Sequence, residues 1–123
     1  IKSIEKMIGG EIFVPKIPSY KITDIAKAIG PNCLLEIMGL RPGEKLHEEM
    51  ITVNDSSFTL DLGNYYVILP NQDKLTNFLS VYKKAQRVNP NFSYNSGNNT
   101  DFLGVEKIRQ LIIKNIDSSF KPR

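Results

Sequence analysis

The sequence predicts an α/β fold, because patterns typical of strands and of helices alternate along the chain. Short β-rich runs at residues 11–15 and 58–69 predict strands, the second of them with a turn in its middle. Apolar residues spaced by three and four over residues 105–116 predict an amphipathic helix. A chain of 123 residues is long enough for one domain with one hydrophobic core.

The N-terminal elements follow from the same patterns. Residues 1–8 resemble the last turns of a helix closed by Gly9 and Gly10, so we expect the chain to be a fragment that begins inside a helix, or to have a cleaved N-terminus. Residues 11–15 end at a proline and predict a strand. Thr23 is the expected N-cap of a two-turn helix that reaches Ile29.

The next two elements complete a predicted local order of strand, helix, strand, helix. Residues 33–40, "CLLEIMGL", predict a second strand. It leads into "RPGEK", after which Leu46, Met50 and Ile51 predict a short amphipathic helix.

The second half of the chain begins with a predicted β-hairpin around Gly63 and Asn64. Spacings of three, four and seven among Leu75, Phe78, Leu79 and Tyr82 then predict a helix. Residues 88–101 are rich in Asn, Ser, Pro and Gly and are predicted to be irregular. A flexible linker is one interpretation of this region. The aromatic residues Phe92, Tyr94 and Phe102 favour packing onto another element instead.

Composition and charge exclude some classes of partner. The net charge is +3 and the isoelectric point is near 9.0, but the only tight basic group is Lys83, Lys84 and Arg87, without interleaved aromatic residues. A nucleic-acid partner is therefore not expected. No apolar run has the length of a membrane span. The single Cys33 cannot form an internal disulfide, which favours the cytoplasm.

The stretch "GLRPGEKLHEE", residues 39–49, is the candidate ligand site. Pro42 and Gly43 predict a tight turn that leaves the Arg41 side chain projecting from a strand end. A helix starting near Glu44 would offer free N–H groups to an anion, and a guanidinium binds phosphate oxygens in pairs. The carboxylate of Glu44 would suit the vicinal hydroxyls of a ribose. The alternative is a surface turn in which Arg41 pairs with Glu44 or Glu48, and spacing alone favours it.

Two long stretches, residues 9–29 and 39–51, resemble the C-terminal part of the inverting UDP-N-acetylglucosamine 4,6-dehydratases. These are extended short-chain dehydrogenase/reductases of polysaccharide and glycan biosynthesis, and related capsular proteins are UDP-sugar 4-epimerases. Residues 61–70 and 92–103 are also similar to the family's last segments. The resemblance implies that residues 1–70 form a substrate-binding region and residues 71–123 a C-terminal extension.

The resemblance also implies chemistry that this chain does not carry. The family binds NADP, or NAD, on an N-terminal Rossmann domain through a glycine-rich loop, and uses a Tyr-x-x-x-Lys pair. No G-x-x-G-x-x-G occurs here, and none of the five tyrosines has a lysine four positions on. In the family a hydride leaves C4, a base takes the C5 proton, water leaves from C6, and hydride returns to C6 with inversion at C5. The fragment alone is expected to be inactive, with no catalytic or metal-binding residue.

Three residues are the predicted substrate-binding residues. By resemblance, Arg41 matches a position that contacts the UDP moiety and Glu44 a position at the ribose or uridine. Lys16 follows a predicted strand and could reach the site, but the alternative of a solvated lysine at a strand end is favoured at least as much. His47 is the only histidine, and packing on a helix face is favoured over a role as general base.

The sequence is compatible with several hypotheses about function. The implied partner is a UDP-sugar, and the full-length protein is expected to form a homo-oligomer. A 4-epimerase of the same family is the first alternative to the dehydratase. A nucleotide-binding module without catalysis, or an oligomerisation module, is the second.

Overall fold

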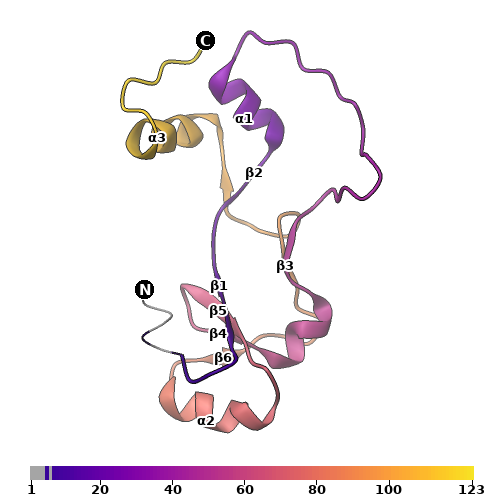
Figure 1. Cartoon of the computed structure of the whole chain (residues 1–123), viewed down its shortest axis with the longest axis vertical. Helices are drawn as coiled ribbons and strands as arrows, with labels where there is room; N and C mark the ends of the chain where they lie inside the picture. Colours follow the sequence, from indigo (N-terminus) through magenta and orange to yellow (C-terminus); the bar gives the residue numbers. More distant parts are fainter. Residues whose placement is uncertain (1–4, 6) are drawn as a thin grey trace. The chain divides into compact units, whose positions relative to one another are not determined.

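The computed structural model describes residue 5 and residues 7–123, and Figure 1 shows the whole chain. Most of the helix predicted over residues 1–8 lies outside the described residues. The chain divides into two compact units, each built from two stretches of sequence. Unit 1 comprises Ile1–Ile17 and Glu49–Asn95, and unit 2 comprises Pro18–Glu48 and Ser96–Arg123. Strands and helices occur in both, so the predicted α/β class is confirmed.

Unit 1 contains a four-stranded antiparallel sheet in the order β1-β5-β4-β6 (Figure 1). The predicted strand is β1 (Ile12–Pro15), and the predicted hairpin is β4 (Thr59–Asp61) with β5 (Tyr65–Ile68). The edge strand β6 (Gln86–Arg87) was not predicted, because two residues are too few to show a period.

Alternation along the strands gives this sheet two apolar faces. Val67 lies on one face, in a core with Leu60 and Phe78, the last from helix α2 (Asp73–Val81). Tyr66 and Ile68 lie on the other, against the cluster of Val14, Ile51 and Tyr94. Because successive side chains of a strand point to opposite faces, a four-residue strand contributes to both cores.

The second face is covered by the short antiparallel pair of β3 (Glu49–Ile51) and β7 (Tyr94–Asn95). The ring centroids of Phe92 and Tyr94 lie 5.0 and 5.3 Å from that of Tyr66. The Tyr94 hydroxyl also accepts the Ile17 N–H at 2.9 Å and donates to the Ile17 carbonyl at 2.8 Å. The prediction that these two aromatic residues pack onto another element is confirmed, and the linker interpretation is wrong for this part of the segment.

The helix predicted after "RPGEK" is wrong, and so is the local order that included it. Residues 44–48 are non-helical and run into β3, with the 3-10 helix η2 (Val53–Phe58) following. Leu46 is 74% exposed, whereas Ile51 is fully buried. A two-turn helix has little stability of its own, so pairing with β7 and burial of Ile51 decide the conformation.

Unit 2 contains two helices and one parallel strand pair. Strand β2 (Ser19–Tyr20) pairs with β8 (Phe102–Leu103), and helix α1 (Ile22–Ile29) packs against α3 (Val105–Asn115). The C-terminal helix is confirmed. The N-cap of α1 is Lys21, so the prediction of Thr23 as N-cap is wrong.

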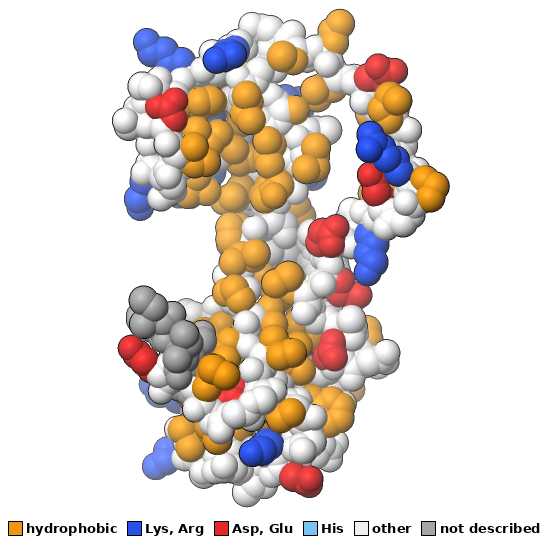
Figure 2. Space-filling view, viewed as in Figure 1, with side chains coloured by type: hydrophobic (Ala, Val, Ile, Leu, Met, Phe, Trp, Pro, Cys, Tyr) orange, Lys and Arg blue, Asp and Glu red, His pale blue; other side chains and the backbone are white. Residues whose placement is uncertain are grey.

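The strand predicted over residues 33–40 is also wrong. The segment belongs to the irregular loop from α1 to β3, in which every residue from 31 to 48 is exposed. Leu34 is 101% and Ile37 89% exposed, and the described residues offer no sheet edge with which this segment pairs. An extended segment without a pairing edge has no ladder hydrogen bonds to hold it as a strand. Figure 2 shows apolar side chains on this loop and also over α1 and α3.

Candidate functional site

Residues 41–44 form a tight turn within unit 2. The Glu44 N–H donates to the Arg41 carbonyl at 3.0 Å, Pro42 occupies the second position, and Gly43 in the third has a φ of 87°. A positive φ at the third position is what a type II turn requires and what glycine supplies without strain. The predicted Pro-Gly turn is confirmed.

The Glu44 carboxylate closes this turn a second time. Its Oε2 accepts the Arg41 N–H at 2.9 Å, and its Oε1 lies 4.0 Å from the Arg41 Nε. The structure therefore contains the pairing of Arg41 with Glu44 that the sequence left as an alternative. The Arg41 side chain stays 80% exposed, so this pair contributes little to stability and leaves the guanidinium accessible.

The predicted phosphate-binding turn at Arg41 lacks one of the groups on which the prediction relied. It relied on the N-terminus of a helix starting near Glu44, and residues 44–48 are not helical. The donors that remain are the guanidinium of Arg41 and the ammonium of Lys45. The binding of an anion here therefore depends on side-chain charge and not on aligned backbone N–H groups.

A shallow cavity of about 480 Å³ lies beside the turn, lined by Gly43, Glu44, Lys45 and Glu48. Its lining carries two carboxylates and one ammonium, and Gly43 leaves one wall without a side chain. Carboxylates accept hydrogen bonds from hydroxyl groups, and an ammonium favours an anion. The cavity thus combines one charged donor for an anion with carboxylate acceptors for hydroxyl groups.

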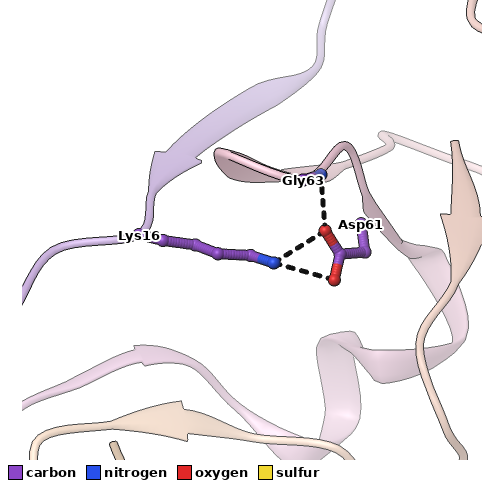
Figure 3. A network of polar contacts seen from close by, with 3 residues as sticks. All are labelled: Lys16, Asp61 and Gly63. Atoms are coloured by element: carbon purple, nitrogen blue, oxygen red, sulfur yellow. Dashed lines mark hydrogen bonds and ion pairs between the residues drawn. The ribbon is translucent and has the colours of Figure 1, made fainter. Parts of the chain in front are cut away.

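Lys16, the third predicted residue, belongs to unit 1. Its Nζ lies 2.8 Å from both carboxylate oxygens of Asp61 and 4.4 Å from the centroid of the Tyr66 ring. Asp61 also accepts the Gly63 N–H at 2.7 Å, as Figure 3 shows. Lys16 therefore holds the end of β1 to the β4–β5 hairpin.

The protonation of Lys16 is stabilised by these partners. Burial alone would lower its pKa, but the hydrogen bond to Asp61 and the charges of Asp61 and Tyr66 outweigh burial and raise the pKa above its ordinary value. The ammonium stays charged at neutral pH, and any anion that it binds must compete with the Asp61 carboxylate.

His47 does not lie on a helix face, because there is no helix at this position. It lies against Gly97, where a Cβ would come within 2.7 Å of the His47 Cδ2. The next residue, Glu48, donates its N–H to the Ser96 Oγ at 3.1 Å and accepts the Ser96 N–H at 2.8 Å. Sequence reasoning missed Ser96 and Gly97, which lie 48 and 50 positions away from their partners.

The structure brings Arg41 and Glu44 together and places Lys16 with Asp61 in the other unit. Asp61 could have been noticed from the sequence, because an aspartate two residues before a glycine is a common acceptor for the turn N–H. No motif links it to Lys16. Among the described residues, no group of three or more His, Cys, Asp and Glu side chains could hold a metal ion.

The residues that the structure describes do not fit a dinucleotide such as NADP. Such a site needs a glycine-rich turn between a strand and a helix of a parallel sheet. The described four-stranded sheet is antiparallel, and the short parallel strand β2 leads into α1 through Lys21 and not through glycines.

The described helices α1, α2 and α3 are also too short or too polar to cross a lipid bilayer.

The fold and the Pro-Gly turn define an α/β protein with a polar cavity beside that turn, and comparison with known proteins places it in a family. The family described as polysaccharide biosynthesis protein matches residues 1–70. This chain belongs to that family.

Two curated relatives are inverting UDP-N-acetylglucosamine 4,6-dehydratases of Campylobacter jejuni serotypes O:2 and O:23/36. They are 44% and 42% identical over a match of 117 residues that covers 91% of this chain and 35% of theirs. The UDP-glucose 4-epimerase of Rickettsia canadensis is 29% identical over 85% of this chain and 31% of its own. The chain thus spans about a third of the length of these relatives.

A solved structure agrees with the fold. The X-ray structure of Pen from Bacillus thuringiensis superposes with a TM-score of 0.67 at 28% identity, covering 92% of this chain and 34% of that one. The resemblance found in the sequence is confirmed, both for the dehydratases and for the epimerases.

Proposed function

We propose that this chain is the substrate-binding part of an inverting UDP-N-acetylglucosamine 4,6-dehydratase of surface polysaccharide or glycan biosynthesis. The observation that carries the proposal is the identity of 44% to such a dehydratase over 91% of the chain. Residues 1–70, the part that the family matches, are the substrate-binding region in this proposal, and residues 71–123 are its C-terminal extension.

Within this proposal Arg41 binds the diphosphate of the UDP-sugar. Its guanidinium is 80% exposed and its partner Glu44 is 4.0 Å away, so a phosphate can approach without breaking a strong pair. A charge-assisted, bidentate contact is worth roughly 1.5 to 3 kcal/mol, which exceeds the 0 to 1 kcal/mol or so of an exposed ion pair.

Glu44 is proposed to bind the ribose hydroxyls. One of its oxygens accepts the Arg41 N–H, and the other can accept from a hydroxyl group. Lys16 is the third proposed contact. Its ammonium is one-third exposed and charged, and an anion that binds it must compete with the Asp61 carboxylate. Of the three residues, Lys16 has the strongest competing partner.

The parent protein is proposed to be an enzyme that depends on NADP, or on NAD, bound by residues outside this chain. The relatives with enzyme names support an enzyme, and the absence of a glycine-rich loop and a Tyr-x-x-x-Lys pair from this sequence supports an inactive isolated fragment. We also propose that the full-length protein forms a homo-oligomer and acts in the cytoplasm.

A UDP-sugar 4-epimerase is the second candidate. Identities of 29 and 30% to several Rickettsia UDP-glucose 4-epimerases, over 85 to 88% of this chain, favour it as the alternative. The dehydratase remains first because its identity is markedly higher over a slightly longer part of the chain.

Incubating the full-length enzyme with UDP-N-acetylglucosamine in deuterated water separates the two. A dehydratase product lacks the mass of one water, and inversion at C5 brings solvent deuterium to that carbon. An epimerase product keeps the substrate's formula and incorporates no deuterium at C5. Mass spectrometry with proton NMR measures both. An epimer of unchanged mass would overturn the dehydratase proposal.

A further inference from the structure

The turn that carries Arg41 lies in a long loop with little structure of its own. Residues 31–48 connect α1 to β3 without a helix or strand, and all of them are exposed. A loop of this length that carries a ligand contact loses conformational freedom when the ligand binds, and that loss lowers affinity. Contacts that hold the loop beforehand therefore raise affinity without touching the ligand.

Such contacts lie on the C-terminal side of the turn. Ser96 binds the backbone of Glu48 in both directions, at 2.8 Å through its N–H and at 3.1 Å through its hydroxyl. Glu48 is itself a lining residue of the cavity beside the turn. One residue of the Asn-rich segment thus holds the backbone of one wall of that cavity.

Gly97 adds a steric contact with the same loop. A Cβ at this position would lie 2.7, 2.8 and 2.9 Å from the Cδ2, Cγ and Nε2 of His47, which are distances that real Cβ atoms do not adopt. The backbone of Gly97 therefore lies directly against the imidazole of His47, three residues after Glu44. Any side chain at residue 97 must displace the ring or the loop.

The other end of the segment is anchored on β2. Asn99 donates its side-chain amide to the Ser19 Oγ at 3.0 Å, and the Ser19 N–H donates to the Asp101 carbonyl at 2.8 Å. The Asn99 Oδ1 accepts the Asp101 N–H at 3.1 Å and so holds the chain between these two points. Residues 96–101 are therefore tied to a strand at one end and to the ligand loop at the other.

We infer that residues 96–101 act as a clasp, in which Ser96 and Gly97 position the Arg41 turn for the UDP moiety. The inference rests on the proposed function. Ser96 and Gly97 are positioning residues: they hold Glu48 and His47, and through them the loop, and do not contact the ligand.

The test is a double-mutant cycle in the full-length enzyme, with UDP affinity measured by calorimetry. Gly97→Ala should weaken UDP roughly three- to tenfold, because the loop is displaced and must be ordered again on binding. His47→Ala removes the ring that the new methyl group meets, so the double variant should bind UDP more tightly than Gly97→Ala alone.

Two further variants test the hydrogen-bonded part of the clasp. Ser96→Ala loses the oxygen that accepts the Glu48 N–H and should weaken UDP, whereas Ser96→Thr keeps a hydroxyl and should retain most of the affinity. NADP affinity should not change in any of these variants and reports on folding. If Gly97→Ala fails to fold and loses NADP as well, the serine pair decides the matter.

The outcomes separate the clasp from the proposed function. Arg41→Ala serves as the reference: if it leaves UDP affinity unaltered, the proposed ligand site fails and the clasp fails with it. If Arg41→Ala weakens UDP while Gly97→Ala and Ser96→Ala leave it unaltered, the clasp alone is refuted. A double variant that stays as weak as Gly97→Ala would also refute it.

Discussion

Replacing Arg41 by alanine in the full-length enzyme should lower its affinity for UDP by roughly one to two decades. The substitution removes a charge-assisted contact worth roughly 1.5 to 3 kcal/mol. In the free protein it breaks only an exposed pair with Glu44 whose closest charged atoms are 4.0 Å apart, so little of the effect is offset there. The Arg41 N–H that binds Glu44 is backbone and remains, so the turn itself is preserved.

Calorimetry with UDP, UDP-N-acetylglucosamine and NADP checks this prediction. Both uridine ligands should weaken together, because Arg41 binds the part that they share, and NADP affinity should stay unchanged. Arg41→Lys is the matched variant and should recover only part of the loss, since an ammonium keeps the charge without the planar pair of donors. Unaltered UDP affinity in a folded Arg41→Ala protein would refute the reasoning and leave residues 39–49 as a surface turn.

Three other predictions concern stability. A double-mutant cycle of thermal or urea unfolding with Lys16→Met and Asp61→Asn should show a coupling free energy of about 0.5 to 1 kcal/mol, because the pair is bidentate but one-third exposed. Additive effects of the two substitutions would contradict the conclusion that Lys16 holds the end of β1 to the hairpin. Burial raises the pKa of Glu11. Hydrogen bonds from the N–H groups of Ile8 and Gly9 and the charge of Lys74 lower the pKa by more than burial raises it, so the pKa lies below its ordinary 4.5. Its stabilisation is therefore present above about pH 4.5 and lost as the pH falls; the deficit of Glu11→Gln in unfolding free energy should shrink over that range, and a deficit independent of pH would contradict this. The isolated 123-residue chain should bind a hydrophobic dye and unfold with low cooperativity, because side chains such as Ile37 are almost fully exposed; a sharp, high-temperature transition of a monomer would contradict this.

The structure argues against the interpretation of the Asn-rich segment as a flexible linker. A linker would leave its polar side chains in water, but Tyr94, Ser96 and Asn99 each bind a residue more than 45 positions away. Many of these partners are backbone groups, which every sequence possesses. The composition that suggested disorder instead supplies donors and acceptors for short-range and long-range hydrogen bonds.

The upstream coding sequence distinguishes a chain that is part of an enzyme from a stand-alone binding module. A coding sequence that extends upstream through a glycine-rich strand-turn-helix and a Tyr-x-x-x-Lys pair would exclude the module. Light scattering on the full-length protein measures its oligomeric state, and a strict monomer would count against the proposed homo-oligomer.

Sequence alone sufficed where the signal is local. The hairpin around Gly63 and the helix α3 were predicted because turn residues and a regular apolar period act over a few neighbouring positions. The Pro42-Gly43 turn was predicted for the same reason, with the positive φ that only glycine adopts freely. Family resemblance was likewise contained in the order of residues over two long stretches.

Tertiary structure alone decided the conformation on either side of that turn. Residues 33–40 have the composition of a strand but find no edge among the described residues, whereas Ile51 becomes part of a strand because Tyr94 lies opposite it. The pairing of Lys16 with Asp61 and of Glu48 with Ser96 joins positions 45 and 48 residues apart. Local propensity carries no information about such partners, because a β-pair or an ion pair gains its free energy only when the fold brings both halves together.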